Sequence, residues 1–597
     1  MDREHDRATL SRRRRRTLWI SLFCSTCALL LLFTLLLSCD APWSVTASPT
    51  PTPAPYAVTC RHHSHDPVTL TLYYGSEKEA WMSDVIADFN HHHYAACDGI
   101  ITVNAIPIGS GASLEQILNG SIQPDVWSPA GSVWLSLLNA RWHQKTGRDL
   151  IDMGAKATPS LVSSPVVIAM WKPLAAALGW PQRAIGWSDI ARLGDDPRGW
   201  AAYGHPEAGS FKFGHTHPAY SNSGLDAIIA MSYAALGKQR GLTLADIQDL
   251  RVRNFIADIE KSVIHYGDST GFFADEMFNK GPSFLSAAVM YENLVVEAND
   301  GHSYPHLPFP VVAIYPKEGT FYSDHPYAIL HGGWLTPAKE SAAEVLQAFL
   351  LAPQQQAKAL RYGFRPAVPS IALGAPIDSA HGVDPEQPRT TLQVPSVDVV
   401  NAIENTWQAQ KRHVAAMLIL DTSGSMNEGF NGMSKIDAAR QGLSDFVRLM
   451  SDDDILGLTT FSDQASVISP LSPVGAKRQQ VLRQIAAITA DGGTRLFDTI
   501  AEQVQALSRF TTNDIKAVVV LTDGQDNVSK LSLNELLQRI TPQGEDAGRG
   551  IKVFTIAYGN DADADALKSI AAATGAQEYA GTPQNIRTVY DQISLFF

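Results

Sequence analysis

The feature that most constrains the fold is an apolar run, Val414–Leu420, that leads directly into the sequence DTSGS at residues 421–425. A short apolar run bounded by turn-forming residues predicts a buried strand. The polar motif therefore lies where that strand ends, which is the edge at which open parallel sheets bind ligands. One carboxylate and two hydroxyls gathered there predict an oxygen-rich site for a hard divalent cation such as Mg2+.

Two later segments bring further oxygen-bearing side chains to the ends of predicted elements. Thr494 lies in a glycine-containing loop that follows a predicted helix over 477–489. A second apolar run, Ala517–Leu521, predicts another buried strand, and this strand leads to Asp523. Strand and helix patterns alternate through the last third of the chain, which predicts an α/β fold.

With these segments in place, the last third of the chain resembles a von Willebrand factor A domain. The metal-ion-dependent adhesion site of that family, or MIDAS, consists of D-x-S-x-S, a distant Thr and a distant Asp. Each position is matched in this sequence, by Asp421, Ser423, Ser425, Thr494 and Asp523. The resemblance implies that the first three contact Mg2+ or its waters and that the other two complete the shell. It also implies that Mn2+ or Ca2+ can serve instead, and that the acidic side chain of a protein partner takes a position left to water.

An ordinary turn and helix cap is the alternative interpretation of the same residues. Asp, Ser and Gly are common turn formers, and an Asp that ends a strand can cap the following helix. Agreement across three separate segments favours the metal site over that alternative.

Length, composition and charge limit the partners. The chain has 597 residues, of which 45% are hydrophobic and 18% are charged, as is typical of a globular protein of several domains. The formal net charge is -13. We expect no nucleic-acid partner, because an acidic chain without a basic stripe does not suit a phosphate backbone.

The first 39 residues have the pattern of a targeting segment. The basic run Arg12–Arg16 precedes an apolar stretch, Leu18–Leu37, which is close to the length that crosses a bilayer. The stretch closes on Leu-Leu-Ser-Cys, which resembles a bacterial lipobox with Cys39 as the lipidated residue. An uncleaved N-terminal anchor is the alternative. Either form predicts a protein held at the extracytoplasmic face of the cell membrane. A Pro/Thr-rich linker over 40–66 follows the targeting segment.

Two cysteines, Cys60 and Cys97, remain for the exported body of the chain. In an oxidising compartment they can form a disulfide. Two free thiols are the alternative, and the sequence does not decide between them.

Residues 67–411 show a second α/β pattern. A strand-like run, Val68–Tyr74, is followed by Gly-Ser, and a helix with apolar spacing follows over Glu79–Asn90. Strand and helix then alternate again, which predicts a further α/β region.

This region resembles the two-lobed, class 2 extracellular solute-binding proteins of the periplasmic type. The resemblance is carried by the order of several segments: Ser163–Met170 as the strand that crosses the hinge, the W-S-D-I step at 187–190, the sequence S-N-S-G at 221–224 and the G-F-R-P turn at 363–366. It implies a periplasmic-binding-protein-like domain over 67–411, followed by a doubly wound, Rossmann-like A domain over 412–597.

Several serines of this region lie where a strand or loop passes into a predicted helix. They are Ser76, Ser128, Ser221 and Ser223. Helix N-termini present unpaired N–H groups and the positive end of the dipole, so converging serines predict a site for an oxyanion or other polar solute. Tyr291 of the second lobe can add a hydroxyl. The alternative is that each serine only caps its own helix.

The motifs point to binding rather than catalysis. The sequence has no P-loop and no H-E-x-x-H, so we expect no enzyme activity. We predict a membrane-tethered extracytoplasmic binding protein with a solute-binding-like module and a Mg2+-dependent A domain that binds a protein partner. Two alternatives remain: the substrate receptor of an ABC-type transporter docked through its A domain, and a metal-dependent hydrolase that uses the A-domain cation.

Overall fold

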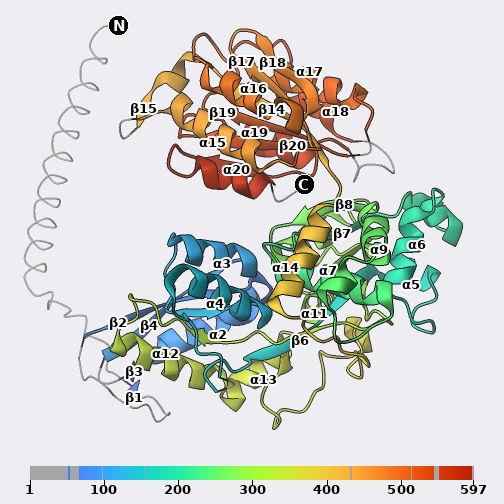
Figure 1. Cartoon of the computed structure of the whole chain (residues 1–597), viewed down its shortest axis with the longest axis vertical. Helices are drawn as coiled ribbons and strands as arrows, with labels where there is room; N and C mark the ends of the chain where they lie inside the picture. Colours follow the sequence, from blue (N-terminus) through green and yellow to red (C-terminus); the bar gives the residue numbers. More distant parts are fainter. Residues whose placement is uncertain are drawn as a thin grey trace, which may run out of the picture. The chain divides into compact units, whose positions relative to one another are not determined.

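The computed structural model describes residues 52–53, 66–96, 99–154, 156–430, 433–512, 514–542 and 550–594 (Figure 1). The predicted targeting segment, the lipidation residue Cys39 and the cysteines Cys60 and Cys97 lie outside the described residues. Within the described part of the chain, no helix is both long enough and apolar enough to span a membrane.

The first lobe is built on a mixed sheet assembled from two separate stretches of sequence. The strands of this sheet follow the order β1 (Thr52–Pro53), β3 (Tyr94–Ala96), β4 (Gly99–Pro107), β2 (Val68–Tyr74), β5 (Val126–Ser128) and β12 (Ala328–Ile329). Strand β2 is parallel to β4 and β5, whereas β12 returns from much later in the chain and is antiparallel to β5. Its helices are η1 (Ser76–Lys78), α2 (Glu79–His92), α3 (Ser110–Asn119), α4 (Val133–Thr146), α12 (Pro337–Leu350) and α13 (Pro353–Arg361).

The second lobe is built around β6 (Val162–Trp171), the strand predicted to cross the hinge. Its sheet has the order β10 (Val311–Ile314), β6, β9 (Ala287–Tyr291), β7 (Phe213–Thr216) and β8 (Val263–Gly267). The first residues of β6 pair instead with β11 (Tyr322–Ser323) and β13 (Arg365–Pro366), which belong to the returning chain. One long strand therefore holds several distant segments in register.

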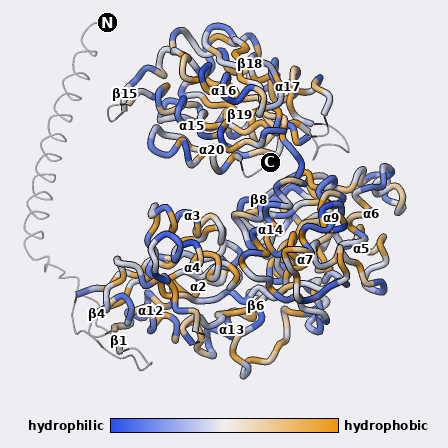
Figure 2. The backbone as a smooth tube through the Cα atoms, in the orientation of Figure 1, coloured by the Kyte–Doolittle hydropathy of each residue, from blue (hydrophilic) through white to orange (hydrophobic). Residues whose placement is uncertain are grey.

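The second lobe also contains helices, which pack against this sheet or against one another. They are α5 (Lys172–Ala177), α6 (Trp187–Asp195), η2 (Gly199–Tyr203), η3 (Pro206–Ala208), α7 (Asn222–Leu236), α8 (Leu244–Ile247), α9 (Leu250–Glu260), α10 (Thr270–Lys280), α11 (Glu292–Ala298), η4 (Ser379–His381) and α14 (Val397–Gln408). Helix α7 is buried along most of its length and is largely hydrophobic in Figure 2. A helix that is apolar on nearly all sides belongs to the core of its domain.

A buried polar contact fixes α14 to the second lobe. Trp407 is 1% exposed, and its Nε1 donates to Glu260 Oε1 over 2.9 Å. His215 Nε2 lies 2.9 Å from the same carboxylate oxygen. A buried carboxylate is tolerated when its oxygens are bonded, so this contact anchors the helix that leads into the last sheet.

The last sheet is parallel except at one edge. Its strands follow the order β18 (Ala465–Pro473), β17 (Ile455–Phe461), β14 (Val414–Asp421), β19 (Ile515–Thr522), β20 (Lys552–Tyr558) and β21 (Glu578–Gly581). Only β18, at the edge, pairs antiparallel. Between the strands lie η5 (Gly424–Asn427), the hairpin β15 (Gly429–Phe430) and β16 (Met433–Ser434), α15 (Lys435–Leu449), α16 (Val474–Ala486), α17 (Leu496–Arg509), α18 (Leu533–Ile540), α19 (Ala564–Ala573) and α20 (Ile586–Ser594).

Alternate residues of β14 enter two different cores. Ala416, Leu418 and Leu420 pack with residues of α15, α16 and α20, whereas Met417 and Ile419 pack with residues of α17, α18 and α19. Successive side chains of a strand point to opposite faces, so helices cover both faces of this sheet (Figure 1). The predicted α/β class and the doubly wound architecture of this region are confirmed.

Candidate functional site

The two central strands of the last sheet bring the predicted metal ligands to one edge. Strands β14 and β19 are parallel and in register, with Leu420 opposite Leu521. Asp421 therefore ends its strand beside Thr522, and Asp523 follows immediately. Both carboxylates have 0% exposure. Two buried acids thus lie at the carboxyl ends of adjacent parallel strands. We call the group formed by Asp421, Asp523, Ser423, Ser425 and Thr494 the metal cup.

A chain of hydrogen bonds joins the cup residues. The backbone N–H of Ser423 donates to Asp421 Oδ1 over 2.7 Å. The hydroxyls of Ser423 and Ser425 lie 3.0 Å apart, and the Ser425 hydroxyl donates to Asp523 Oδ1 over 2.8 Å. The structure thus brings these four residues together within hydrogen-bonding reach.

A neighbouring loop places Thr494 at the same edge. Gly424 N donates to Gly492 O over 2.9 Å, and Gly492 has φ +91°, a conformation that favours glycine. Thr494 is 3% exposed, and its N–H donates to Asn527 Oδ1 over 2.8 Å. A Cβ on Gly524 would lie 3.2 Å from Thr494 Oγ1, so the threonine hydroxyl lies against the residue that follows Asp523.

The electrostatics of the cup favour a cation. Burial raises the pKa of Asp421 to about 6, and the nearby charge of Asp523 adds to this effect, while hydrogen bonds from Thr522 and Ser423 oppose it. Two buried carboxylates side by side are costly unless a positive charge compensates them. The donors are carboxylate and hydroxyl oxygens, the set that suits Mg2+, Mn2+ or Ca2+ rather than a thiolate-binding metal. The residues present therefore fit a hard divalent cation.

Sequence reasoning missed one residue of the cup, Lys435. Its Nζ donates to Asp523 Oδ2 over 2.8 Å, and its side chain is 11% exposed. Burial lowers the pKa of Lys435, but hydrogen bonds to Asp523 and Glu428 outweigh this and raise it overall. A signal was present in the sequence, because a lysine at the first residue of a helix opposes the helix dipole.

The described residues hold no group of three or more His, Cys, Asp or Glu side chains arranged to bind a metal ion. The metal cup is not a group of that kind, because it contains only two acids and its other side chains supply hydroxyls. A zinc-like site rich in histidine or cysteine is not found among the residues the structure describes.

The two lobes meet at a seam, which we define by the contacts of Ser76, Gly111 and Trp134 of the first lobe with Gly271, Tyr220 and Asn222 of the second. Ser76 Oγ of the first lobe accepts from Gly271 N of the second over 3.2 Å. Ser221 precedes α7 and Ser223 lies in its first turn, and both hydroxyls lie within 3.0 Å of Thr270 Oγ1. Ser221, the N-cap of α7, makes no side-chain cap to its helix, and the N-cap of η1 is Gly75 rather than Ser76.

The remaining two predicted residues differ in their surroundings. Tyr291 accepts from Asn222 Nδ2 over 3.1 Å, which ties it to the start of α7. Ser128 ends β5, whereas α4 begins only after Ser132, so Ser128 does not lead directly into a helix as the sequence suggested. Its buried hydroxyl has no hydrogen-bond partner among the described residues.

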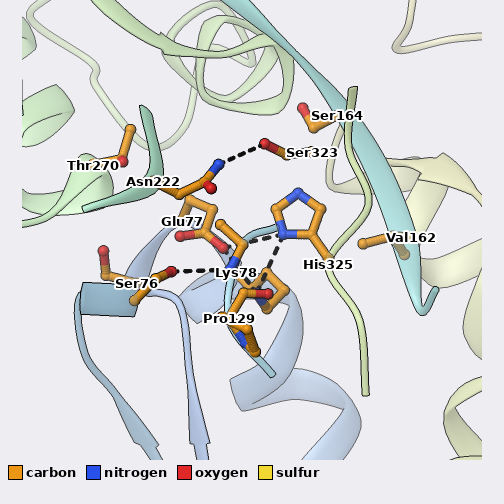
Figure 3. Close-up of polar contacts among 12 residues, drawn as sticks. Ser76, Glu77, Lys78, Pro129, Val162, Ser164, Asn222, Thr270, Ser323 and His325 are labelled. Atoms are coloured by element: carbon orange, nitrogen blue, oxygen red, sulfur yellow. Dashed lines mark hydrogen bonds and ion pairs between the residues drawn. The ribbon is translucent and has the colours of Figure 1, made fainter. Parts of the chain in front are cut away.

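A buried ion pair, also missed from sequence, occupies the middle of the seam. Lys78 Nζ donates to Glu77 Oε1 over 2.8 Å and lies 3.2 Å from His325 Nδ1 (Figure 3). Burial raises the pKa of Glu77, but the charge of Lys78 and the bond from His325 outweigh it, and the pKa falls to about 2. His325 Nε2 is buried without a partner among the described residues. Sequence alone did not indicate this group, because neighbouring opposite charges usually remain in solvent and here both are buried.

Backbone of the two lobes comes into direct contact beside this ion pair. Gly111 N donates to Tyr220 O over 2.9 Å, and Trp134 Nε1 donates to Asn222 Oδ1 over 2.9 Å. A Cβ on Gly111 would lie 2.0 Å from Ala219 O. The absence of a side chain at this position therefore allows the close approach of the lobes.

Comparison with known proteins finds a similarity for each of the two modules. Residues 70–365 match the family of bacterial extracellular solute-binding proteins, and residues 417–592 match the von Willebrand factor type A domain. The chain therefore resembles a solute-binding module joined to an A domain, and these two terms name its parts below. Both are typically non-catalytic binding modules, and together they support an extracytoplasmic binding protein.

Individual relatives match one or both modules. An uncharacterized protein of Mycobacterium tuberculosis is 24% identical over 511 residues, which cover 81% of this chain and 69% of that protein. Calcium-activated chloride channel regulator 1 of Homo sapiens is 30% identical over 166 residues, or 27% of this chain and 16% of that protein.

Two solved structures match the separate modules. A periplasmic thiamin binding protein has a TM-score of 0.42 and 15% identity, and the match covers 59% of this chain and 99% of that one. A von Willebrand factor type A protein from Catenulispora acidiphila has a TM-score of 0.27 and 20% identity, and the match covers 31% of this chain and 42% of that one.

The close contact of the lobes at Gly111 allows us to predict how one added methyl group changes the stability of the module. Gly111→Ala within α3 would normally favour the helix by about 0.5–1 kcal/mol. We expect it instead to destabilise the solute-binding module by about 1–3 kcal/mol, because the new Cβ meets the backbone of the other lobe. Calorimetric unfolding checks stability, and small-angle scattering checks whether the lobes separate. Gly333→Ala is the control, since a Cβ there meets nothing within 4 Å. Equal behaviour of the two variants would show that the seam does not depend on Gly111.

The buried carboxyl of Asp226 should make the stability of the folded chain depend on pH. Burial raises the pKa of this carboxyl to about 8, so the folded chain keeps its proton where the unfolded chain, with a pKa of about 4, has lost it. Stability should therefore fall as pH rises from about 4 to 8, by at most about 5 kcal/mol from this group. Asp226→Asn removes the titration and should flatten the decline, measured by urea unfolding at pH 5, 6, 7 and 8. Parallel pH curves for the two proteins would contradict the assignment.

Proposed function

We propose that the A domain binds Mg2+, or Mn2+ or Ca2+, in the metal cup and uses it to bind a protein partner through an acidic side chain. Asp421, Ser423 and Ser425 would contact the cation or its waters, and Thr494 and Asp523 would complete the shell. The observation that carries the proposal is the burial of two carboxylates, at 0% exposure, within one hydrogen-bonded group of hydroxyls.

The cation, when bound, supplies a coordination position for a carboxylate oxygen of the partner. The protein's own residues do the rest. Burial keeps Asp421 and Asp523 away from bulk water, where their charges would be screened. The bonds from Ser423 N and the Ser425 hydroxyl hold one oxygen of each carboxylate in a fixed orientation. A rigid cup of this kind suits recognition, because little ordering is needed when the partner binds.

We further propose that the solute-binding module takes a polar solute or oxyanion through Ser76, Ser128, Ser221, Ser223 and Tyr291. The unpartnered hydroxyl of Ser128 supports this, because a buried polar group without a partner is unusual in a protein interior. The same observation favours a second candidate function, the substrate receptor of an ABC-type transporter. Uptake of a bound solute by a permease would distinguish the receptor from a partner-binding adaptor.

We also propose that the chain is tethered to the extracytoplasmic face of the cell membrane, by a lipid on Cys39 or by an uncleaved N-terminal anchor. The basic run and apolar stretch of the first 39 residues support the tether. The module boundaries that follow from the sequence patterns, 67–411 and 412–597, belong to this proposal.

The metal proposal predicts a stabilising effect of Mg2+ that depends on Asp421. Because a ligand bound only by the folded state stabilises it by about 2.7 kcal/mol at 100 times its Kd, saturating Mg2+ should raise the unfolding temperature of the A domain. EDTA should reverse the effect, and Asp421→Ala should abolish it.

Asp453→Ala, at an exposed position of the same domain, is the matched control and should keep the full Mg2+ response. No Mg2+ response in the unaltered chain, or an intact response in Asp421→Ala, would contradict the assignment. Metal-dependent turnover of phosphoesters or peptides in the same samples would favour the hydrolase alternative.

A further inference from the structure

Lys435 occupies a position inside the metal cup that the helix alone does not explain. It is the first residue of α15, where the positive end of the helix dipole disfavours a cation. Its Nζ nevertheless lies 2.8 Å from Asp523 Oδ2, and Asp523 has 0% side-chain exposure. The ion pair with this buried carboxylate therefore accounts for the position of the lysine.

The backbone of Lys435 is held in place on both sides. Its N–H donates to Glu428 O over 3.0 Å, and the hydroxyl of Tyr558 donates to its carbonyl over 3.1 Å. Its Nζ also lies 2.8 Å from Glu428 Oε2 and 3.7 Å from Asp561 Oδ2, but these carboxylates are 61% and 74% exposed. Exposed ion pairs contribute little, so the buried contact to Asp523 dominates. The backbone of Lys435 is therefore fixed, whereas its four-carbon side chain is flexible. This combination allows the ammonium group to move away from Asp523.

Every carboxylate oxygen of the cup already accepts a hydrogen bond. Asp421 accepts from Ser423 N and from the Thr522 hydroxyl, and Asp523 accepts from the Ser425 hydroxyl and from Lys435. Of these donors, Lys435 alone carries a charge. A divalent cation that uses Asp523 has to share this carboxylate with the ammonium or displace it, and two cations at one buried carboxylate repel each other.

We propose that Lys435 is a tethered monovalent cation that competes with the divalent cation for Asp523 and thereby weakens divalent-cation binding. The inference rests on the proposed metal site. Without metal, the lysine compensates one of the two buried carboxylates; with metal, the ammonium loses this contact and turns toward Glu428 and Asp561 at the rim. The cup therefore fills at a higher metal concentration than the same oxygens would need without the lysine.

Neutral replacement of the lysine tests the proposal in the full-length chain. Lys435→Gln keeps a neutral N–H donor for Asp523 and removes the charge. We expect it to bind Mg2+ and Mn2+ at least about tenfold more tightly than the unaltered chain by isothermal titration calorimetry. Lys435→Arg keeps the charge and should retain the weaker binding. Lys568→Gln removes an exposed lysine on α19 and should leave the affinity unchanged.

Stability without metal provides a second readout. In EDTA, Lys435→Gln should unfold at a lower temperature than the unaltered chain, because Asp523 is left buried without its counter-charge. Saturating Mg2+ should bring the two proteins together or reverse their order. A lysine with a merely structural role would lower the unfolding temperature equally with and without metal.

The remaining outcomes each decide the matter. Equal or weaker metal binding by Lys435→Gln overturns the competition while leaving the metal site intact. A Lys435→Gln chain that folds only in excess Mg2+ supports it, and one that stays unfolded in excess Mg2+ overturns it. If the unaltered chain and Lys435→Gln both fold but neither binds metal, the proposed metal site fails together with this inference.

Discussion

Asp421 and Asp523 are buried side by side at the ends of two neighbouring parallel strands, and much of the A domain's architecture serves to hold them there. The pairing of β14 with β19 sets their separation, because Leu420 lies opposite Leu521. The two apolar cores on either face of β14 fix the sheet beneath them. Two like charges in a poorly solvated place are unfavourable by themselves. The hydroxyls, the backbone N–H and the lysine that surround them are the compensation that the fold provides.

The residues of the cup are marked in the sequence by local patterns. Asp421 and Asp523 each follow a continuous apolar run, and such a run identifies a buried strand and its end. Parallel strands then bring their carboxyl ends to one edge, so the closeness of the two acids follows from topology. Lys435 was missed because its contact depends on the path of the β15–β16 hairpin, which local patterns do not determine. Only its unfavourable place at a helix start hinted at a role.

The solute-binding module shows the opposite balance. Its α/β class and the order of its segments were evident, and the serines at the seam were identified individually. Their partners were not, because each partner lies far along the chain: Thr270 meets Ser221 and Asn222 meets Tyr291 once the second lobe has folded, and Gly271 meets Ser76 across the two lobes. The pair of Lys78 and Glu77 is a further case, since neighbouring opposite charges usually remain in solvent and here both are buried. Tertiary packing, and not residue type, decides which polar groups of the seam are internal.

The path of the chain from α14 into β14 has a mechanical consequence. Trp407 anchors α14 through Glu260, the helix ends at Gln408, and β14 begins at Val414 and ends at the cup. A pull exerted by anything gripped at Asp421 would therefore load β14 along its length. That strand is bonded to β17 on one side and to β19 on the other, so the load is shared in shear by two ladders that must break together. The cup therefore sits at the end of a strand that is held by a ladder on each side.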